Sequence, residues 1–283
     1  MRCPMNSDIL SAARQIERAE AILVGAGAGM GVDSGLPDFR GDEGFWRAYP
    51  PLKRLGLSFV DMANPAWLEA DPKLAWGFYG HRLHLYRDTD PHEGFYILRR
   101  WIARAGNGFV FTSNVDGQFQ KAGYEEHIVE CHGSLHHLQC ARGCAKGYDQ
   151  AIWSANETRV SVDPDTFQAA TPLPACPRCG GLARPNVLMF GDGDWRPERT
   201  DAQEAAFRRW LAEIRGLRLV IIECGAGRAV PTVRRACEAV ARDLDATLIR
   251  INPREPEGPP GILSIAAGAL ATLTEIDSRL GSA

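Results

Sequence analysis

Long apolar runs are missing from this sequence of 283 residues. The longest ones, such as LVII at residues 219–222, are far shorter than the ~20 apolar residues that a membrane-spanning helix needs. The N-terminal stretch MRCPMNSDIL also lacks the apolar core of a signal peptide. We therefore expect a chain that neither spans a membrane nor is secreted, and we predict a cytoplasmic location.

A strong excess of one charge is missing as well. The formal net charge is −3 at pH 7, which gives no general attraction to nucleic acid or to an anionic membrane. Apolar residues make up 45% of the chain, which is typical of a globular core and excludes a disordered protein. We therefore expect a globular protein with neither a nucleic-acid partner nor a membrane partner.

Six short apolar runs predict buried strands. They are continuous rather than alternating in polarity, which is typical of a parallel sheet covered on both faces. Apolar residues at helical spacing lie between several of them, for example Phe95, Leu98 and Ile102. Strands that alternate with helices predict an α/β fold with a doubly wound, Rossmann-like parallel sheet. The predicted strands cover residues 21–24, 109–112, 128–131, 187–190, 219–223 and 247–251.

Two segments interrupt this alternation and predict a second, smaller lobe. Residues 46–91 are rich in aromatic residues and proline, and we predict helices there. Residues 139–185 hold cysteine, proline and glycine with little periodicity. We expect these two inserts to form a helical and zinc-binding lobe, whereas residues 1–45, 92–138 and 186–283 form the Rossmann-like domain.

Four of the eight cysteines stand in two close pairs, Cys140/Cys144 in CARGC and Cys176/Cys179 in CPRCGG. A tetrahedral zinc ion takes four thiolates at ~2.3 Å, and two short loops of this kind supply them. The pairs predict one structural zinc without an open position for catalysis. A nucleic-acid-binding zinc ribbon is the competing interpretation, and the acidic net charge argues against it. The remaining cysteines are expected to be free or buried thiols: Cys3, Cys131, Cys224 and Cys237.

A glycine-rich stretch follows the first predicted strand and predicts a phosphate-binding loop at Gly27-Ala28-Gly29. The residues PDFR follow directly, where a dinucleotide-binding dehydrogenase would continue into a smooth helix. Polar residues or glycines also follow several other predicted strands. Ligands of open α/β sheets bind at the carboxyl ends of the strands, so these residues are candidates for a site. They are Asn114, Asp116, His132, Gly225, Gly227 and Asn252.

In this order, the motifs resemble the sirtuin family of NAD-dependent protein deacylases. The segments that carry the resemblance span nearly the whole chain: GAGMGVDSGLPDFRG, TSNVDGQFQKAG, CHGS, the two cysteine pairs, PNVLMFGD, CGAG and IN. The resemblance implies NAD as co-substrate and acyl-lysine proteins or peptides as partners. It also implies that the reaction releases nicotinamide and O-acyl-ADP-ribose and leaves a free lysine.

The resemblance implies a role for each matching residue. His132 matches the general base, and an imidazole titrates in the range that suits removal of a ribose hydroxyl proton. Asn114 matches the second catalytic position, where an amide can hold ribose hydroxyls or a water. Phe190, Gly191 and Asp192 match the segment that pairs with the substrate peptide as an added strand. The implied NAD-binding residues are Gly27, Ala28, Gly29, Asp38, Phe39, Arg40, Asn114, Asp116, Gly225, Gly227 and Asn252.

Three positions depart from the family pattern. Gly31 stands where most members have Ser, Ser113 where they have Gln, and CGAG replaces the usual Gly-Thr-Ser. Because Gly31 and Ser113 remove side-chain hydrogen bonds near the ribose and phosphates, two alternatives remain open. The first alternative is a mono-ADP-ribosyltransferase that uses the same site. The second is a non-catalytic module that senses NAD.

Tyr79 and Arg82 predict the acyl group that is removed. They are spaced i, i+3, so on a helix they share a face. A hydroxyl beside a guanidinium can hold a carboxylate. In the sirtuin branch that prefers succinyl- and malonyl-lysine, a Tyr-x-x-Arg at this place reads the free carboxylate of the acyl group. The alternative is a packed tyrosine and a solvated arginine, and Arg54 or Arg87 could also lie nearby.

Overall fold

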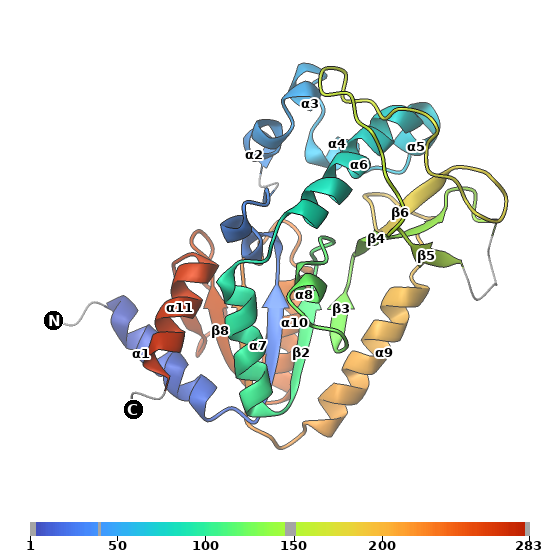
Figure 1. Ribbon diagram of the computed structural model, residues 1–283. Coiled ribbons are helices and arrows are strands. Elements are labelled where there is room, and N and C mark those ends of the chain that lie inside the picture. Colours follow the sequence, from blue (N-terminus) through green and yellow to red (C-terminus); the bar gives the residue numbers. More distant parts are fainter. Residues whose placement is uncertain (1–3, 39–40, 145–150, 281–283) are drawn as a thin grey trace.

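The computed structural model describes residues 4–38, 41–144 and 151–280 (Figure 1). Its main element is a six-stranded parallel sheet in the order β3-β2-β1-β7-β8-β9. This is the doubly wound order, and the direction of winding reverses between β1 and β7. The strands are β1 (Ala21–Ala26), β2 (Gly108–Thr112), β3 (Ile128–Glu130), β7 (Leu219–Cys224), β8 (Thr247–Ile251) and β9 (Leu263–Ile265).

Helices cover both faces of this sheet, which explains why its strands are apolar at most positions. Ile22 and Val24 of β1 pack against α1 (Pro4–Glu17), α7 (Glu93–Ala105) and α11 (Ala269–Arg279). Leu23, between them, faces the other side, where α9 (Glu198–Glu213) and α10 (Thr232–Asp243) pack. The predicted Rossmann-like fold class is therefore confirmed.

A second part of the molecule lies over the carboxyl ends of these strands (Figure 1). It contains an antiparallel sheet in the order β5-β4-β6, formed by β4 (Gly133–Cys140), β5 (Ile152–Ser154) and β6 (Ala183–Val187). Aromatic residues of the helical segment pack against this sheet in one separate core, which includes Tyr49, Phe78 and Leu138. The helices here are α2 (Gly41–Ala48), α3 (Pro50–Arg54), α4 (Phe59–Met62), α5 (Trp67–Ala70) and α6 (Pro72–Asp88).

Three short helical turns follow strands β1 and β2. Two are 3₁₀ turns after the first strand, η1 (Ala28–Met30) and η2 (Val32–Ser34). The third is α8 (Gln118–Lys121), which follows β2. Each of them lies at the carboxyl end of its strand and thus beside the expected ligand site.

One predicted strand is wrong. Residues 187–190 were expected in the parallel sheet, but the strand there is β6, it ends at Val187, and it belongs to the small antiparallel sheet. The apolar side chains of Leu188 and Phe190 are 39% and 38% exposed, so this run is apolar for a reason other than burial in a sheet. The expected boundaries at 138/139 and 185/186 fall inside β4 and β6, which pair with each other.

Among the described residues, no helix has both the length and the apolar composition that a membrane crossing requires.

Candidate active site

A cavity of about 720 Å³ lies at the carboxyl ends of β1, β2, β3 and β7. The second part of the molecule forms its other wall. Its volume is within the usual range for small-molecule sites. Many of the residues that were predicted from the sequence line this one cavity: Gly27, Ala28, Asp38, Tyr79, Arg82, Asn114, Asp116, His132, Phe190, Gly225 and Gly227.

Two glycine loops meet on one side of the cavity. The amide of Gly27 donates to the carbonyl of Cys224 (3.0 Å), and the amide of Gly29 donates to that of Gly225 (3.1 Å). A Cβ on Gly225, whose φ is +64°, would lie 2.4 Å from the Cα of Gly29, so only glycine allows this approach. The close packing leaves main chain rather than side chains along this part of the wall.

Asn114 and Asp116 follow β2. The Asn114 amide group donates to the carbonyl of Gly27 (3.1 Å), which ties the loop after β2 to the glycine loop. The Asp116 carboxylate accepts from the amide of Gln118 (2.9 Å), and its own carbonyl lies 2.9 Å from Nε2 of His136. Burial raises the pKa of Asp116 to about 6. Its charge therefore titrates close to physiological pH.

His132 lies between β3 and β4, and burial lowers its pKa below the usual value. The imidazole is therefore neutral at pH 7, as a general base must be. Its Nε2 lies 3.3 Å from the hydroxyl of Thr232, which begins α10. Thr232 was not identified from the sequence, because only the fold brings α10 to the end of β3.

Tyr79 and Arg82 lie on α6 and reach the cavity from the second part of the molecule. Nε and Nη2 of Arg82 donate to the hydroxyl of Tyr86 at 3.0 and 2.7 Å. The guanidinium also lies 5.1 Å from the ring centroid of Phe78. The Tyr79 hydroxyl is buried and has no hydrogen-bond partner among the described residues.

Two other arginines that are near Arg82 in the sequence, Arg54 and Arg87, bind main-chain carbonyls outside the cavity. Arg54 donates to the carbonyl of Asp165 (2.9 Å), and Arg87 donates to those of Ala155 and Thr158 (2.6 and 2.7 Å). Neither lines the cavity.

Four predicted site residues lie outside the cavity wall. Gly29 lies behind Gly225, as described above. Gly191 and Asp192 do not line the cavity either, and the Asp192 carboxylate is fully buried against the guanidinium of Arg184. The Asp192 side chain therefore forms a structural ion pair, and the pairing of residues 190–192 with a substrate peptide stays a prediction.

Asn252 is the fourth, and its predicted role at the adenosine half of NAD stays a prediction. Its side chain is fully buried. Its amide group donates to the carbonyl of Ala226 (2.9 Å), and its oxygen accepts from the amides of Arg254 and Glu255 (both 3.0 Å). Asn252 thus holds two loops together and does not face the cavity. Two further predicted residues, Phe39 and Arg40, lie outside the described residues.

The structure adds residues that sequence reasoning missed. Arg228, Arg254 and Glu255 line the cavity beside the second glycine loop, and Arg254 lies 3.8 Å from the carboxylate of Asp38. Exposed apolar side chains form the rim next to Phe190: Val60, Leu188 and Val230. For Leu188, the signal was present as an apolar run and was interpreted as part of a strand.

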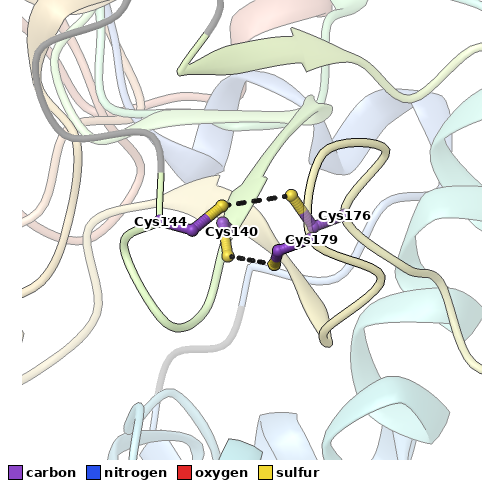
Figure 2. A group of neighbouring side chains, drawn as sticks. All are labelled: Cys140, Cys144, Cys176 and Cys179. Atoms are coloured by element: carbon purple, nitrogen blue, oxygen red, sulfur yellow. Dashed lines mark hydrogen bonds between the residues drawn. The ribbon is translucent and has the colours of Figure 1, made fainter.

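The four paired cysteines converge on one point (Figure 2). The sulfurs of Cys140 and Cys179 are 3.7 Å apart, those of Cys144 and Cys176 are 3.6 Å apart, and all four lie within 4.8 Å of one another. Tetrahedral zinc with ~2.3 Å bonds requires sulfurs about 3.8 Å apart, and the two pairwise separations above are close to this value. The set therefore fits a structural zinc ion. Cys131, Cys224 and Cys237 are buried free thiols, as expected.

The fold and the site define a nucleotide-binding α/β protein whose cavity lies between a doubly wound sheet and a lobe with a four-cysteine cluster. A profile described as the Sir2 family matches residues 27–207. A protein named NAD-dependent protein deacylase from Thermus thermophilus is 34% identical over 68% of this chain and 69% of its own length. The chain therefore belongs to the Sir2, or sirtuin, family.

Other relatives cover the chain differently. An NAD-dependent protein deacylase from Aeropyrum pernix is 29% identical over 91% of this chain and 90% of its own. The mitochondrial NAD-dependent protein deacylase sirtuin-5 of Danio rerio is 32% identical over 66% of this chain and 62% of its own. The solved structure of a Sir2 homologue–NAD complex has a TM-score of 0.69 at 22% identity and covers 95% of this chain and 92% of its own. That last likeness shows a shared fold.

Proposed function

We propose that this chain is an NAD-dependent protein-lysine deacylase that releases nicotinamide and O-acyl-ADP-ribose. The main support for this proposal is that one cavity is lined by both glycine loops, by Asn114 and Asp116, and by His132. The family membership supports the same activity, since the relatives described above are named NAD-dependent protein deacylases. A cytoplasmic location stays a prediction.

The residues present fit NAD. Main chain at Gly27 and Ala28, and at Gly225 and Gly227, lines the wall where a diphosphate needs close approach. Asp38 lies on the same wall. The predicted contributions of Phe39 and Arg40 remain proposals.

NAD supplies an activated ribosyl carbon with nicotinamide as the leaving group. Asp116 would accept from the carboxamide of nicotinamide, and Asn114 would hold ribose hydroxyls or a water beside the reacting carbon. His132 would remove a proton from a ribose hydroxyl. Its lowered pKa keeps the imidazole neutral, and so able to accept a proton, at neutral pH. The hydroxyl of Thr232 would fix the orientation of this imidazole.

The acyl-lysine substrate would enter between the two parts of the molecule. We propose that residues 46–91 and 139–185 form a small lobe and that residues 1–45, 92–138 and 186–283 form the NAD-binding domain. The peptide would pair with the main chain around Phe190 and Gly191 as an added strand. The exposed apolar side chains of Leu188 and Phe190 support a peptide groove at this place.

Mass spectrometry of the products tests the proposal against its alternatives. The protein is incubated with NAD and an acyl-lysine peptide. Free lysine together with O-acyl-ADP-ribose supports deacylation. Transfer of ADP-ribose to protein, which the Ser113 departure in the cavity wall keeps as a candidate, would instead identify a mono-ADP-ribosyltransferase. NAD binding without any product would identify a sensing module.

Asp116→Asn is expected to weaken nicotinamide placement more than adenosine binding. A carboxylate accepts hydrogen bonds, whereas an amide also presents donors toward the carboxamide. Inhibition by nicotinamide should become weaker in this variant, and in the wild type it should weaken as the pH falls through about 6, where Asp116 gains its proton. Inhibition constants at several pH values measure both effects. Unchanged inhibition together with unchanged turnover contradicts the assignment.

We also propose that Cys140, Cys144, Cys176 and Cys179 hold one structural zinc ion. Their sulfur separations support it, and four thiolates leave no position for a catalytic water. Elemental analysis of carefully purified protein should find about one zinc per chain. Cys176→Ala should lower metal content, solubility and activity together, because zinc binding is coupled to folding. Less than about half an equivalent in the wild type argues against the site.

A further inference from the structure

Two loops form the cavity wall beyond the first glycine loop, residues 225–230 after β7 and residues 252–258 after β8, and we refer to them as the rim loops. Gly225, Gly227 and Arg228 of the first rim loop line the cavity, and so do Arg254 and Glu255 of the second. Neither rim loop contains a helix or strand. Their shape is therefore fixed by side-chain contacts, some of them between the loops, as from Asn252 to Ala226, and some from outside the loops.

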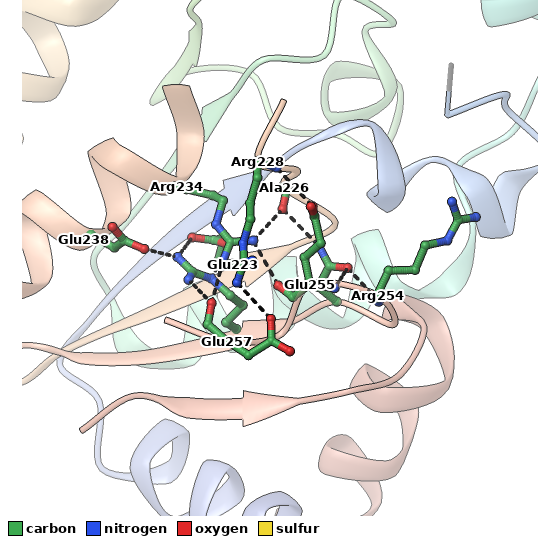
Figure 3. Close-up of polar contacts among 10 residues, drawn as sticks. Glu223, Ala226, Arg228, Arg234, Glu238, Arg254, Glu255 and Glu257 are labelled. Carbon is green, nitrogen blue, oxygen red and sulfur yellow. Dashed lines mark hydrogen bonds and ion pairs between the residues drawn. The ribbon is translucent and has the colours of Figure 1, made fainter. Parts of the chain in front are cut away.

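Arg234 in the first turn of α10 supplies such contacts (Figure 3). The side chain is buried, with 5% exposure of the residue. Its Nη1 donates to the carbonyls of Ala226 (3.3 Å) and Glu255 (2.9 Å), and its Nη2 donates to the carbonyl of Glu257 (2.5 Å). One guanidinium thus satisfies three main-chain carbonyls, which belong to both rim loops.

A second buried arginine, Arg250, balances this arrangement. Arg250 of β8 pairs with both oxygens of Glu223 (2.6 and 2.8 Å) and with Glu238 (2.7 Å), and it also donates to the carbonyl of Glu257 (2.9 Å). The two carboxylates offset the two guanidinium charges in this interior. Arg250 donates mainly to carboxylates, whereas Arg234, among the described residues, donates only to carbonyls of the rim loops.

The strand order assigns an end of the cofactor to the rim loops. They follow β7 and β8, on one side of β1, whereas Asn114, Asp116 and His132 follow β2 and β3 on the other side. A dinucleotide lies across the point where the winding reverses. With nicotinamide at the β2 and β3 side, the adenosine half lies against the rim loops.

We propose that Arg234 is a positioning residue for the adenosine half of NAD, acting through the three carbonyls that it holds. This inference rests on the proposed function. Arg234 does not line the cavity and so acts through the rim loops rather than by touching the cofactor.

The test uses Arg234→Met in the full-length chain. Methionine fills part of the space but leaves the carbonyl of Glu255 without its donor and removes one of two donors from the carbonyls of Ala226 and Glu257, which is costly in a buried site. We expect the Kd for ADP-ribose, measured by calorimetry, to rise about 30-fold. The KM for NAD should rise in parallel, while kcat and the inhibition constant of nicotinamide stay within about twofold of the wild type.

The value of kcat distinguishes a loss of cofactor positioning from a general disturbance of the fold. Thr232 lies two residues away on α10 and contacts His132, so a disturbance of the helix would lower kcat as well. Arg234→Lys keeps a charge and three donors and should recover part of the affinity. Arg235→Met is the matched control, because Arg235 is the exposed neighbour on the same helix, and it should behave as the wild type.

Three results overturn the inference. In the first, Arg234→Met binds ADP-ribose within about twofold of the wild type. In the second, it loses kcat and both substrate affinities together. The third result applies if Arg234→Met fails to fold. It is a KM for NAD in Arg234→Lys that is unchanged from the wild type. A wild-type protein that binds neither NAD nor ADP-ribose would overturn the proposed function itself, which is a distinct outcome.

Discussion

His132→Ala is expected to lower deacylation about 10²–10⁴-fold, the usual contribution of a general base, while NAD still binds. The wall at Gly27, Ala28, Gly225 and Gly227 is main chain and does not depend on the imidazole. The loss should therefore appear in kcat, with little change in the Kd for NAD. Single-turnover rates and calorimetry on the same preparation measure the two quantities.

His127→Asn provides a matched control for this variant. His127 is an exposed histidine at the start of β3, the opposite end of the strand from His132. Its φ of +59° is one that asparagine tolerates. The control should keep full turnover. If His132→Ala keeps more than about a tenth of wild-type turnover, the base is another group.

A distinct expectation concerns nicotinamide release, which precedes the step that needs the base. His132→Ala should still exchange labelled nicotinamide into NAD in the presence of an acyl peptide, because Asp116 and Asn114 remain in place. Loss of exchange together with loss of turnover would indicate that the substitution disturbs the cavity as a whole. The exchange assay therefore separates a missing base from a damaged site.

The parallel sheet was predictable because each of its strands is buried on two faces. Ile22 and Leu23 of β1 enter different cores, so most positions had to be apolar, and that pattern is visible in the sequence. The small sheet was not predictable in this way. In β4, Leu138 is buried by the helical segment and Cys140 by the cysteine cluster, so its burial depends on parts of the chain that are remote in sequence.

For residues 187–190, the sequence predicted a buried strand that the structure does not contain. An apolar run was interpreted as a buried strand, although Leu188 and Phe190 are partly exposed at the rim of the cavity. Apolar composition records contact with something other than water, and it does not distinguish a protein core from a binding groove. The short strand β9 and helix α11 went unrecognised, although Leu273 and Ile276 lie on one buried face of that helix.

The candidate site was predictable where main chain or strand ends carry it. Glycines at the ends of β1 and β7, and polar residues after β2 and β3, are local signals that the fold brings together. The contacts of Asn252, Thr232 and Arg234 could not be predicted, because they join segments that are separated along the chain. For Asn252, the strand-end position was right, but the side chain turns to the main chain of its neighbours.

Arg82→Met is expected to remove a preference of the enzyme for succinyl over acetyl peptides. Arg82 lies on the cavity wall with Tyr79, whose hydroxyl has no hydrogen-bond partner in the described part of the chain. A carboxylate that enters would accept from both groups and would gain a counter-charge in a buried site. The substitution should cost succinyl substrates about 2–3 kcal/mol in kcat/KM, the scale of a hydrogen bond to a charged group. Deacetylation should be spared, because an acetyl group has no carboxylate.

The contacts of Arg82 bear on how Tyr79 and Arg82 would hold a carboxylate. Tyr86 already accepts two of its donors, and the ring of Phe78 lies close to the guanidinium, so the charge is fixed in place before a substrate arrives. A fixed cation loses less side-chain entropy on binding than a solvated one. The alternative of a solvated arginine on a surface helix does not describe this residue, which is 5% exposed.

Two further variants make the acyl prediction decisive. Tyr79→Phe removes one hydroxyl and should reduce the succinyl preference by less than Arg82→Met does, since it removes a neutral donor rather than a charge. Arg54→Met is the matched control, because this arginine donates to a carbonyl outside the cavity and should leave selectivity unchanged. The measurement is kcat/KM for peptides that differ only in the acyl group. A wild-type enzyme that strongly prefers acetyl peptides, or an Arg82→Met variant with unaltered selectivity, would show that this pair does not read the acyl carboxylate.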